Sequence, residues 1–204
     1  MMGLDNAGKS TALYRMRTGQ YCETIPTIGF NCEKVKGKIN KSKDVVFTIW
    51  DVGGQDRVRP LWRTYARGAE GIMFVLDSAD HTTLEEAKLE LIQLFKHSDT
   101  NHLPIVILAN KQDMPNAYDL NYLNYYLLNG LDSELAIVKP GFKTNVNHHT
   151  NNNSNNNIIS DVNDKVKIVS ACAITGDGLD ESLDVLYEMI LKNKQKPSKT
   201  KRTK

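Results

Sequence analysis

The chain has 204 residues, of which 40% are apolar and 25% charged, and its formal net charge is +2. This size and composition are typical of one globular domain with a core. The apolar runs are too short for a membrane-spanning helix, and we expect no signal peptide. The three cysteines Cys22, Cys32 and Cys172 are scattered. They favour reduced thiols in a cytoplasmic protein over a disulfide framework.

The chain begins with a glycine-rich loop that predicts a phosphate-binding site. The loop matches G-x-x-x-x-G-K-[S/T] at every fixed position and consists of Gly3, Leu4, Asp5, Asn6, Ala7, Gly8, Lys9 and Ser10. Glycines let backbone N–H groups point at an anion, the lysine can reach the terminal phosphates, and the serine hydroxyl can coordinate Mg²⁺. We include the next residue, Thr11, in the predicted nucleotide site. Such a loop is expected to follow a buried strand, yet only Met1 and Met2 precede it.

Helical and strand patterns alternate after the loop. We expect a helix from Lys9 to about Thr18, then strands at 32–39 and 45–51 joined by a polar turn. Further strands are predicted at 72–76, 104–109 and 166–170, and apolar residues recur at helical spacing in 84–94, 120–127 and 179–190. This alternation predicts an α/β fold with a mostly parallel sheet flanked by helices.

Two segments depart from the pattern of a packed domain. Residues 145–157 are rich in asparagine and predict a disordered insert within a domain spanning residues 1–194. Within the insert, His148 and His149 are better explained as part of a polar tract than as a metal site. Seven basic residues and no acidic one lie in 192–204, so the rest of the chain is mildly acidic. Residues 195–204 are predicted to form a basic, disordered tail.

A second motif lies at the end of the predicted strand 45–51. Asp51 ends the strand and is placed to support Mg²⁺, usually through water. Gly54 can offer its backbone N–H to a γ-phosphate, and Gln55 can orient an attacking water.

A third motif, at the end of strand 104–109, predicts which base is bound. The Asp113 carboxylate can accept hydrogen bonds from the N1–H and amino group of guanine, which adenine lacks. Lys111 can lie along the base, and Asn110 can tie neighbouring loops together. After the last strand, a backbone amide at Cys172 or Ala173 could contact the oxygen O6 of the base.

With these motifs in this order, the chain resembles the Arf and Arf-like family of small GTPases, with a tail similar to the basic-tailed Arf-like branch. Residues 26–31 are similar to the first switch segment of that family, and residues 50–55 and 59–62 are similar to its second. The resemblance implies a P-loop small-GTPase fold, GTP or GDP with Mg²⁺, and a switch with slow GTP hydrolysis. It implies that Thr27 closes on Mg²⁺ and the γ-phosphate. It also implies that Phe30, Trp50 and Tyr65 form an apolar patch for effectors.

Family members carry an N-terminal helix and then a strand before the phosphate loop, so we expect an N-terminally truncated chain. Loss of that strand should leave backbone groups unpaired on both of its neighbours in the sheet. Two other functions stay open: an ATP-using P-loop enzyme, against which Asp113 argues, and a non-catalytic interaction module that retains no nucleotide.

The resemblance implies an exchange factor, a GTPase-activating protein and effectors as partners, and a role in membrane traffic or membrane-linked signalling. We expect a monomer that binds no nucleic acid. The tail could bind an anionic membrane, act as a nuclear import signal, or remain a solvated end.

Overall fold

The computed structural model describes residues 1–39, 42–128 and 165–195. The predicted insert at 145–157, with His148 and His149, lies outside the described residues, as do residues 196–204 of the predicted tail. No described helix is long and apolar enough to cross a membrane.

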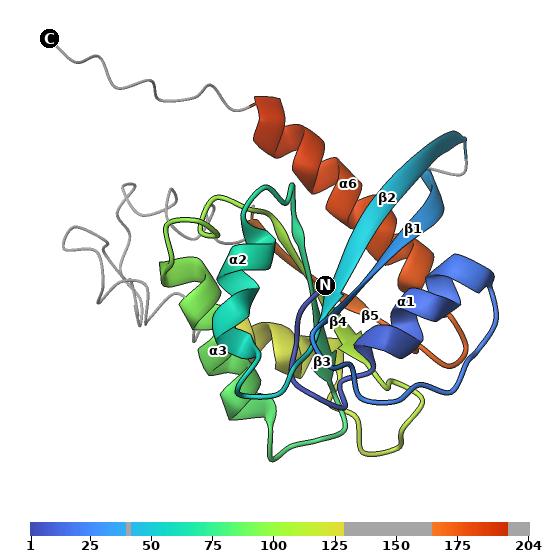
Figure 1. The fold of residues 1–204 in the computed structure, drawn as a ribbon. Helices are drawn as coiled ribbons and strands as arrows, with labels where there is room; N and C mark the ends of the chain where they lie inside the picture. The colour runs from blue at the N-terminus through green and yellow to red at the C-terminus, as the bar shows by residue number, and fades with distance from the viewer. Residues whose placement is uncertain (40–41, 129–164, 196–204) are drawn as a thin grey trace, which may run out of the picture.

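The strands form two groups, which lie side by side in Figure 1. An antiparallel hairpin consists of β1 (Phe30–Ile39) and β2 (Lys43–Val52). A parallel sheet has the order β3 (Ile72–Asp77), β4 (Ile105–Asn110) and β5 (Val166–Ser170). The predicted strands are confirmed, and each observed strand of the hairpin starts about two residues earlier than predicted.

The helices cover both faces of this arrangement (Figure 1). They are α1 (Lys9–Thr18), η1 (Arg59–Leu61), α2 (Trp62–Ala66), α3 (Leu84–Lys96) and α6 (Leu179–Gln195), with a further helical stretch at 120–128. Helix η1 lies within the second switch segment and α2 begins at its last residue, Trp62; neither was expected as a helix. Helix α6 includes Gln195, the first residue of the predicted tail.

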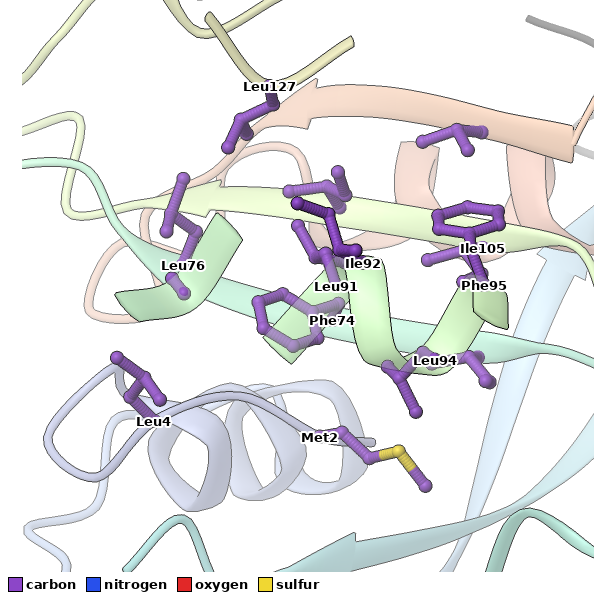
Figure 2. Packing of buried hydrophobic residues seen from close by; sticks show 14 of the residues in the cluster. Met2, Leu4, Phe74, Leu76, Leu91, Ile92, Leu94, Phe95, Ile105 and Leu127 are labelled. Carbon is purple, nitrogen blue, oxygen red and sulfur yellow. The ribbon is translucent and has the colours of Figure 1, made fainter. Parts of the chain in front are cut away.

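Alternate side chains of β3 and β4 enter two separate cores, because successive side chains of a strand point to opposite faces. Phe74 and Ile107 belong to the core beneath α2 and α3, which Figure 2 shows around Leu91 and Phe95. Val75 belongs to the other core, with residues of α1 and α6. Burial on both faces explains why these strands are unbroken apolar runs in the sequence.

Met1 and Met2 occupy the position of a strand between the two groups. Met2 donates its N–H to the Met73 oxygen (2.9 Å) and accepts from Val75 N–H (2.8 Å), which is a parallel bridge to β3. Met1 accepts from Val52 N–H at 3.1 Å on the β2 side. The two methionine side chains enter opposite cores, as in a strand. The expected loss of pairing therefore does not occur at these two residues.

Beyond Met1, a groove of about 760 Å³ continues between β2 and α6. Backbone groups of alternate residues in an antiparallel strand face the same side. Val52 N–H and Trp50 C=O face Met1, so Val46 and Thr48 also turn their backbone groups towards the groove. Within the described residues, nothing outside the hairpin forms hydrogen bonds with the backbone groups of Val46 and Thr48.

Extending the chain before Met1 with an apolar strand that reaches Val45 should therefore raise the melting temperature. The added backbone pairs with groups that face the groove, and its side chains continue the alternation of Met1 and Met2 into the two cores. Thermal unfolding followed by circular dichroism measures the shift. An extension of equal length made of glycine and serine is the control, and equal melting temperatures for the two proteins would contradict the strand geometry.

Candidate functional site

The phosphate loop is held by contacts that only glycine permits at two positions. Gly3 has φ +138°, and a Cβ there would lie 2.1 Å from the Val75 carbonyl oxygen. Gly8 has φ +92° and caps α1, and a Cβ there would lie 2.3 Å from Asn110 Nδ2. The sequence pattern thus reflects close packing of the loop as well as its expected approach to an anion.

Lys9 is buried at the start of α1, close to the loop that precedes it. Its Nζ donates to the carbonyl oxygen of Leu4 at 2.7 Å. Burial lowers the pKa of Lys9, and the nearby Asp51 and Asp5 act in the opposite direction. The ammonium group therefore lies inside the phosphate loop, where it can meet a bound anion.

Three residues from separate elements meet beside Lys9. Ser10 Oγ lies 2.6 Å from Thr27 Oγ1 and donates to Asp51 Oδ2 at 2.6 Å. Thr27 Oγ1 lies 3.5 Å from the same carboxylate oxygen. Burial raises the pKa of Asp51, and hydrogen bonds from Ser10 oppose this effect.

The other carboxylate oxygen of Asp51, Oδ1, is buried and has no hydrogen-bond partner among the described residues. A buried carboxylate oxygen without a partner is costly unless another group satisfies it. Two hydroxyls and a carboxylate are hard oxygen donors of the kind that Mg²⁺ prefers. The residues at this position therefore fit a magnesium ion with its water shell.

The second switch segment lies directly against the phosphate loop. A Cβ at Gly54 would lie 2.3 Å from the carbonyl carbon of Leu4 and 2.4 Å from the Asp5 nitrogen. Gly53 donates its N–H to the Gly29 oxygen at 2.9 Å, which joins the two switch segments. The Gln55 side-chain oxygen Oε1 accepts from the Arg57 guanidinium at 3.2 Å.

The predicted base-recognition loops meet through Asn110. Its Nδ2 donates to the Ala7 oxygen at 2.7 Å, and its Oδ1 accepts from the Ala173 N–H at 2.9 Å. One side chain therefore connects the phosphate loop to the loop after β5, as the sequence predicts. Lys111 has φ +64°, and its Nζ pairs with Asp77 at 2.6 Å.

A cavity of about 390 Å³ collects most of the predicted residues. Its lining includes Asp5, Asn6, Gly8, Lys9, Ser10, Thr11, Thr27, Gly54, Gln55, Asn110, Lys111, Asp113 and Ala173. The lining does not include Gly3, Leu4, Ala7, Asp51 or Cys172. The sequence reasoning missed Tyr21, Glu23, Thr24, Ile25, Pro26, Met114 and Ile174, which also line the cavity. Most of these lie at 21–25, before the switch segment 26–31, where the sequence carries no motif or periodicity.

The backbone amides expected at the base oxygen are both engaged within the protein. Cys172 donates its N–H to the Asp177 oxygen at 3.0 Å, and the Ala173 amide donates to Asn110. The Cys172 side chain instead approaches the predicted base-recognition residue, with Sγ 3.2 Å from Asp113 Oδ1. The neighbouring Ile174 lines the cavity, so this loop contributes more residues than its motif indicates.

Three aromatic rings gather at the surface near the switch segments. The ring centroid of Phe30 lies 5.1 Å from that of Trp50 and 5.2 Å from that of Tyr65. Phe30 and Trp50 are 48% and 43% exposed. The resemblance-based prediction that these three residues form an apolar patch is confirmed. Trp62, in contrast, is buried and donates its Nε1–H to the Gly53 oxygen at 3.0 Å.

Comparison with known proteins agrees with this arrangement. The model of the ADP-ribosylation factor family matches residues 1–190. The chain belongs to the ADP-ribosylation factor family. It is 39% identical over 195 residues to human ADP-ribosylation factor-like protein 4A, covering 96% of this chain and 84% of the relative. Mouse ADP-ribosylation factor-like protein 4D is 37% identical over 203 residues, covering 99% and 87%.

A solved structure extends the comparison to a nucleotide-bound relative. The small GTPase Arl6 (BBS3) from Trypanosoma brucei, with bound nucleotide analogue GppNp, superposes with a TM-score of 0.68 at 26% identity. The alignment covers 95% of this chain and 96% of that one. The protein is therefore a small GTPase of the Arf-like type, a GTP- and Mg²⁺-dependent switch that hydrolyses GTP. Family membership also implies regulators and effectors in general.

Replacing the buried Asp51 by Asn should stabilise the nucleotide-free protein but weaken its Mg²⁺-dependent binding of GDP. Because burial raises its pKa, the folded state binds the carboxyl proton more tightly than the unfolded state. Stability is therefore lost as the pH rises above the ordinary aspartate range, and the neutral amide introduced by Asp51→Asn avoids that loss. We expect a melting temperature several degrees higher at neutral pH without nucleotide, and weaker Mg²⁺-dependent GDP binding.

The exposed Asp44 of the same strand provides the control, because Asp44→Asn should change neither quantity. Calorimetry between acidic and neutral pH measures the difference in stability, which should shrink as the pH falls. A destabilised Asp51→Asn protein at neutral pH without nucleotide would contradict this account.

Proposed function

We propose that the cavity beside α1 binds GTP and GDP, with the phosphates at the loop 3–10 and the base at the segment 110–113. The single observation that carries this proposal is the lining of the cavity, which brings Lys9, Ser10 and Asp113 together from distant parts of the chain. A volume of about 390 Å³ falls within the usual range of small-molecule sites.

The phosphates are held by charge and by backbone N–H groups. When the nucleotide binds, Lys9 Nζ donates to phosphate oxygens in place of the Leu4 carbonyl. This change is favourable because a hydrogen bond from the buried ammonium group to a charged phosphate is stronger than one to a neutral carbonyl. Ser10 and Thr27 would hold Mg²⁺, and Asp51 would support its water shell, because these three side chains meet at one position. Bound Mg²⁺ neutralises negative charge on the phosphate oxygens.

Gln55 orients the attacking water once its side chain leaves Arg57. The contact to Arg57 is long, at 3.2 and 3.4 Å, and exposed, so little opposes this change. The described residues that line the cavity include no arginine to stabilise charge in the transition state. Intrinsic hydrolysis should therefore be slow, on the order of 10⁻⁴–10⁻³ s⁻¹ as in related switches, until a GTPase-activating protein supplies the missing group.

Asp113 selects guanine through its carboxylate. Replacing it by Asn should lower the affinity for GDP at least about tenfold and shift preference towards xanthosine nucleotides, whose C2 oxo group accepts from an amide. Isothermal titration with GDP, XDP and ADP in Mg²⁺ measures the change. Asp99→Asn is the control, because Asp99 does not line the cavity.

Two results would contradict this assignment. Unchanged guanine affinity in Asp113→Asn would mean that another residue recognises the base. Equal affinity of the unmodified protein for ADP would favour the ATP-using alternative, and no binding of any nucleotide would favour the non-catalytic interaction module.

The aromatic patch formed by Phe30, Trp50 and Tyr65 is the proposed effector surface. Its rings join the first switch, the hairpin and α2, so a movement of either switch alters their arrangement. Exposed aromatic rings are typical anchors in protein interfaces. We propose that an exchange factor, a GTPase-activating protein and effectors act on a monomer that binds no nucleic acid.

Residues 196–204 extend the basic composition of the end of α6 and are proposed to hold the protein at an anionic membrane surface. Each basic residue near such a surface contributes about 1 kcal/mol. A peripheral location on cytoplasmic membranes would follow, and the same residues could serve as a nuclear import signal.

The membrane proposal predicts binding that depends on salt. Vesicles containing phosphatidylserine should sediment the protein at low salt, whereas neutral vesicles should not. Deleting residues 196–204, or raising salt until the Debye length is about 3 Å at 1 M, should release it. Binding that survives both treatments would place the attachment elsewhere in the chain, and no binding at low salt would leave the tail as a solvated end.

A further inference from the structure

Arg59, the first residue of η1 in the second switch segment, lies at the centre of a cluster of acidic side chains. Its side chain is only 10% exposed. Four carboxylates surround the guanidinium: Asp56 at 2.6 Å, Glu86 at 2.6 Å, Glu90 at 3.4 Å and Asp5 at 4.0 Å. These residues come from the switch itself, from α3 and from the phosphate loop. Arg59 therefore connects three parts of the molecule that the sequence leaves unrelated.

The same side chain also holds the backbone of Gly54. Arg59 Nε donates to the Gly54 carbonyl oxygen at 2.8 Å. The preceding carbonyl, that of Gly53, accepts from the buried Trp62 indole at 3.0 Å. Because the C=O and N–H of a trans peptide point in opposite directions, these two bonds fix the peptide planes on both sides of Gly54. The Trp62 bond orients the Gly54 N–H, which belongs to the same peptide as the Gly53 carbonyl, and the Arg59 bond holds the peptide that follows. Together they constrain both backbone dihedrals of Gly54.

The support for this arrangement comes from α3. Glu86 and Glu90 lie four residues apart and so share one face of the helix. Ala87 and Leu91 of the same helix are buried in the core that Figure 2 shows. A helix anchored in this way is a rigid base for the guanidinium. Arginine suits the position because its planar fork offers five N–H donors, whereas lysine offers three from a single point.

We propose that Arg59 is a positioning residue that ties Gly54 to α3 and thereby stabilises the triphosphate-bound form over the diphosphate-bound form. The proposal rests on the nucleotide site proposed above. In the proposed site the Gly54 N–H contacts only the γ-phosphate, which GDP lacks. A fixed orientation of this N–H therefore strengthens the binding of the triphosphate alone. The bond to Gly54 also makes this arginine unavailable to the transferred phosphate.

The test compares the dissociation of two fluorescent nucleotides from the full chain in Mg²⁺. The methylanthraniloyl derivatives of GppNp and GDP are loaded onto the unmodified protein, Arg59→Lys, and the double variant Glu86→Gln, Glu90→Gln. In Arg59→Lys we expect GppNp to dissociate about tenfold faster, which corresponds to about 1.4 kcal/mol, with GDP unchanged. The double variant should show the same selectivity to a smaller degree.

Arg67→Ala is the matched control, because Arg67 is an exposed arginine close to η1 that pairs with a single carboxylate, Asp99. Its two dissociation rates should equal those of the unmodified protein. Intrinsic fluorescence, which comes from Trp50 and Trp62, offers a second measurement, since the GppNp-induced change should diminish in Arg59→Lys.

Equal acceleration of both nucleotides, or none, in Arg59→Lys would overturn the role of Arg59. If Arg59→Lys fails to fold, the double variant decides: selective loss of GppNp supports the proposal and any other result overturns it. Failure of the unmodified protein to bind either nucleotide would overturn the proposed function as well, which separates that outcome from failure of the positioning role alone.

Discussion

Backbone contact between the phosphate loop and its neighbours is the constraint on which the rest of the structure depends. Gly3 lies against the Val75 carbonyl, and Gly54 lies against Leu4 and Asp5, at distances that no Cβ could occupy. These contacts hold the loop against β3 and bring the second switch segment to it. A side chain at either glycine would separate elements that must meet for a phosphate to be bound and sensed.

The same site is costly for the folded protein without ligand. Asp51 has a buried oxygen without a partner among the described residues. Burial also raises the pKa of Asp51 and lowers the pKa of Lys9, which favours the neutral form of each side chain. Burying charge in this way is unfavourable unless an opposite charge arrives. Nucleotide and Mg²⁺ supply those charges, so binding and stability are coupled. Polar groups that destabilise the empty protein are the ones that bind the ligand.

The sheet is held in place by buried apolar side chains, whereas the backbone of the second switch segment is held by a few specific hydrogen bonds. The parallel sheet is held by two apolar cores, one on each face. The second switch segment buries Trp62 in one of these cores, and its backbone at Gly53 and Gly54 is held by polar bonds from Trp62 and from Arg59. A segment fixed by a small number of polar bonds can change conformation at modest cost, which a switch requires. The buried sheet stays fixed while the switch segment changes conformation.

The sequence by itself determined the order of strands and helices, because unbroken apolar runs such as 105–109 and the helical spacing of Leu84, Ala87 and Leu91 are local patterns. It also determined the nucleotide motifs, whose spacing reflects local backbone geometry. Only the tertiary structure decided which residues share a site: Tyr21 to Pro26 carry no periodicity, and the switch motif that contains Arg59 does not indicate the four carboxylates that surround it. The pairing of Met1 and Met2 with both neighbouring strands was likewise invisible, since two residues show no alternation. Contacts between distant segments arise from the packing of the whole chain, and a local pattern does not encode them.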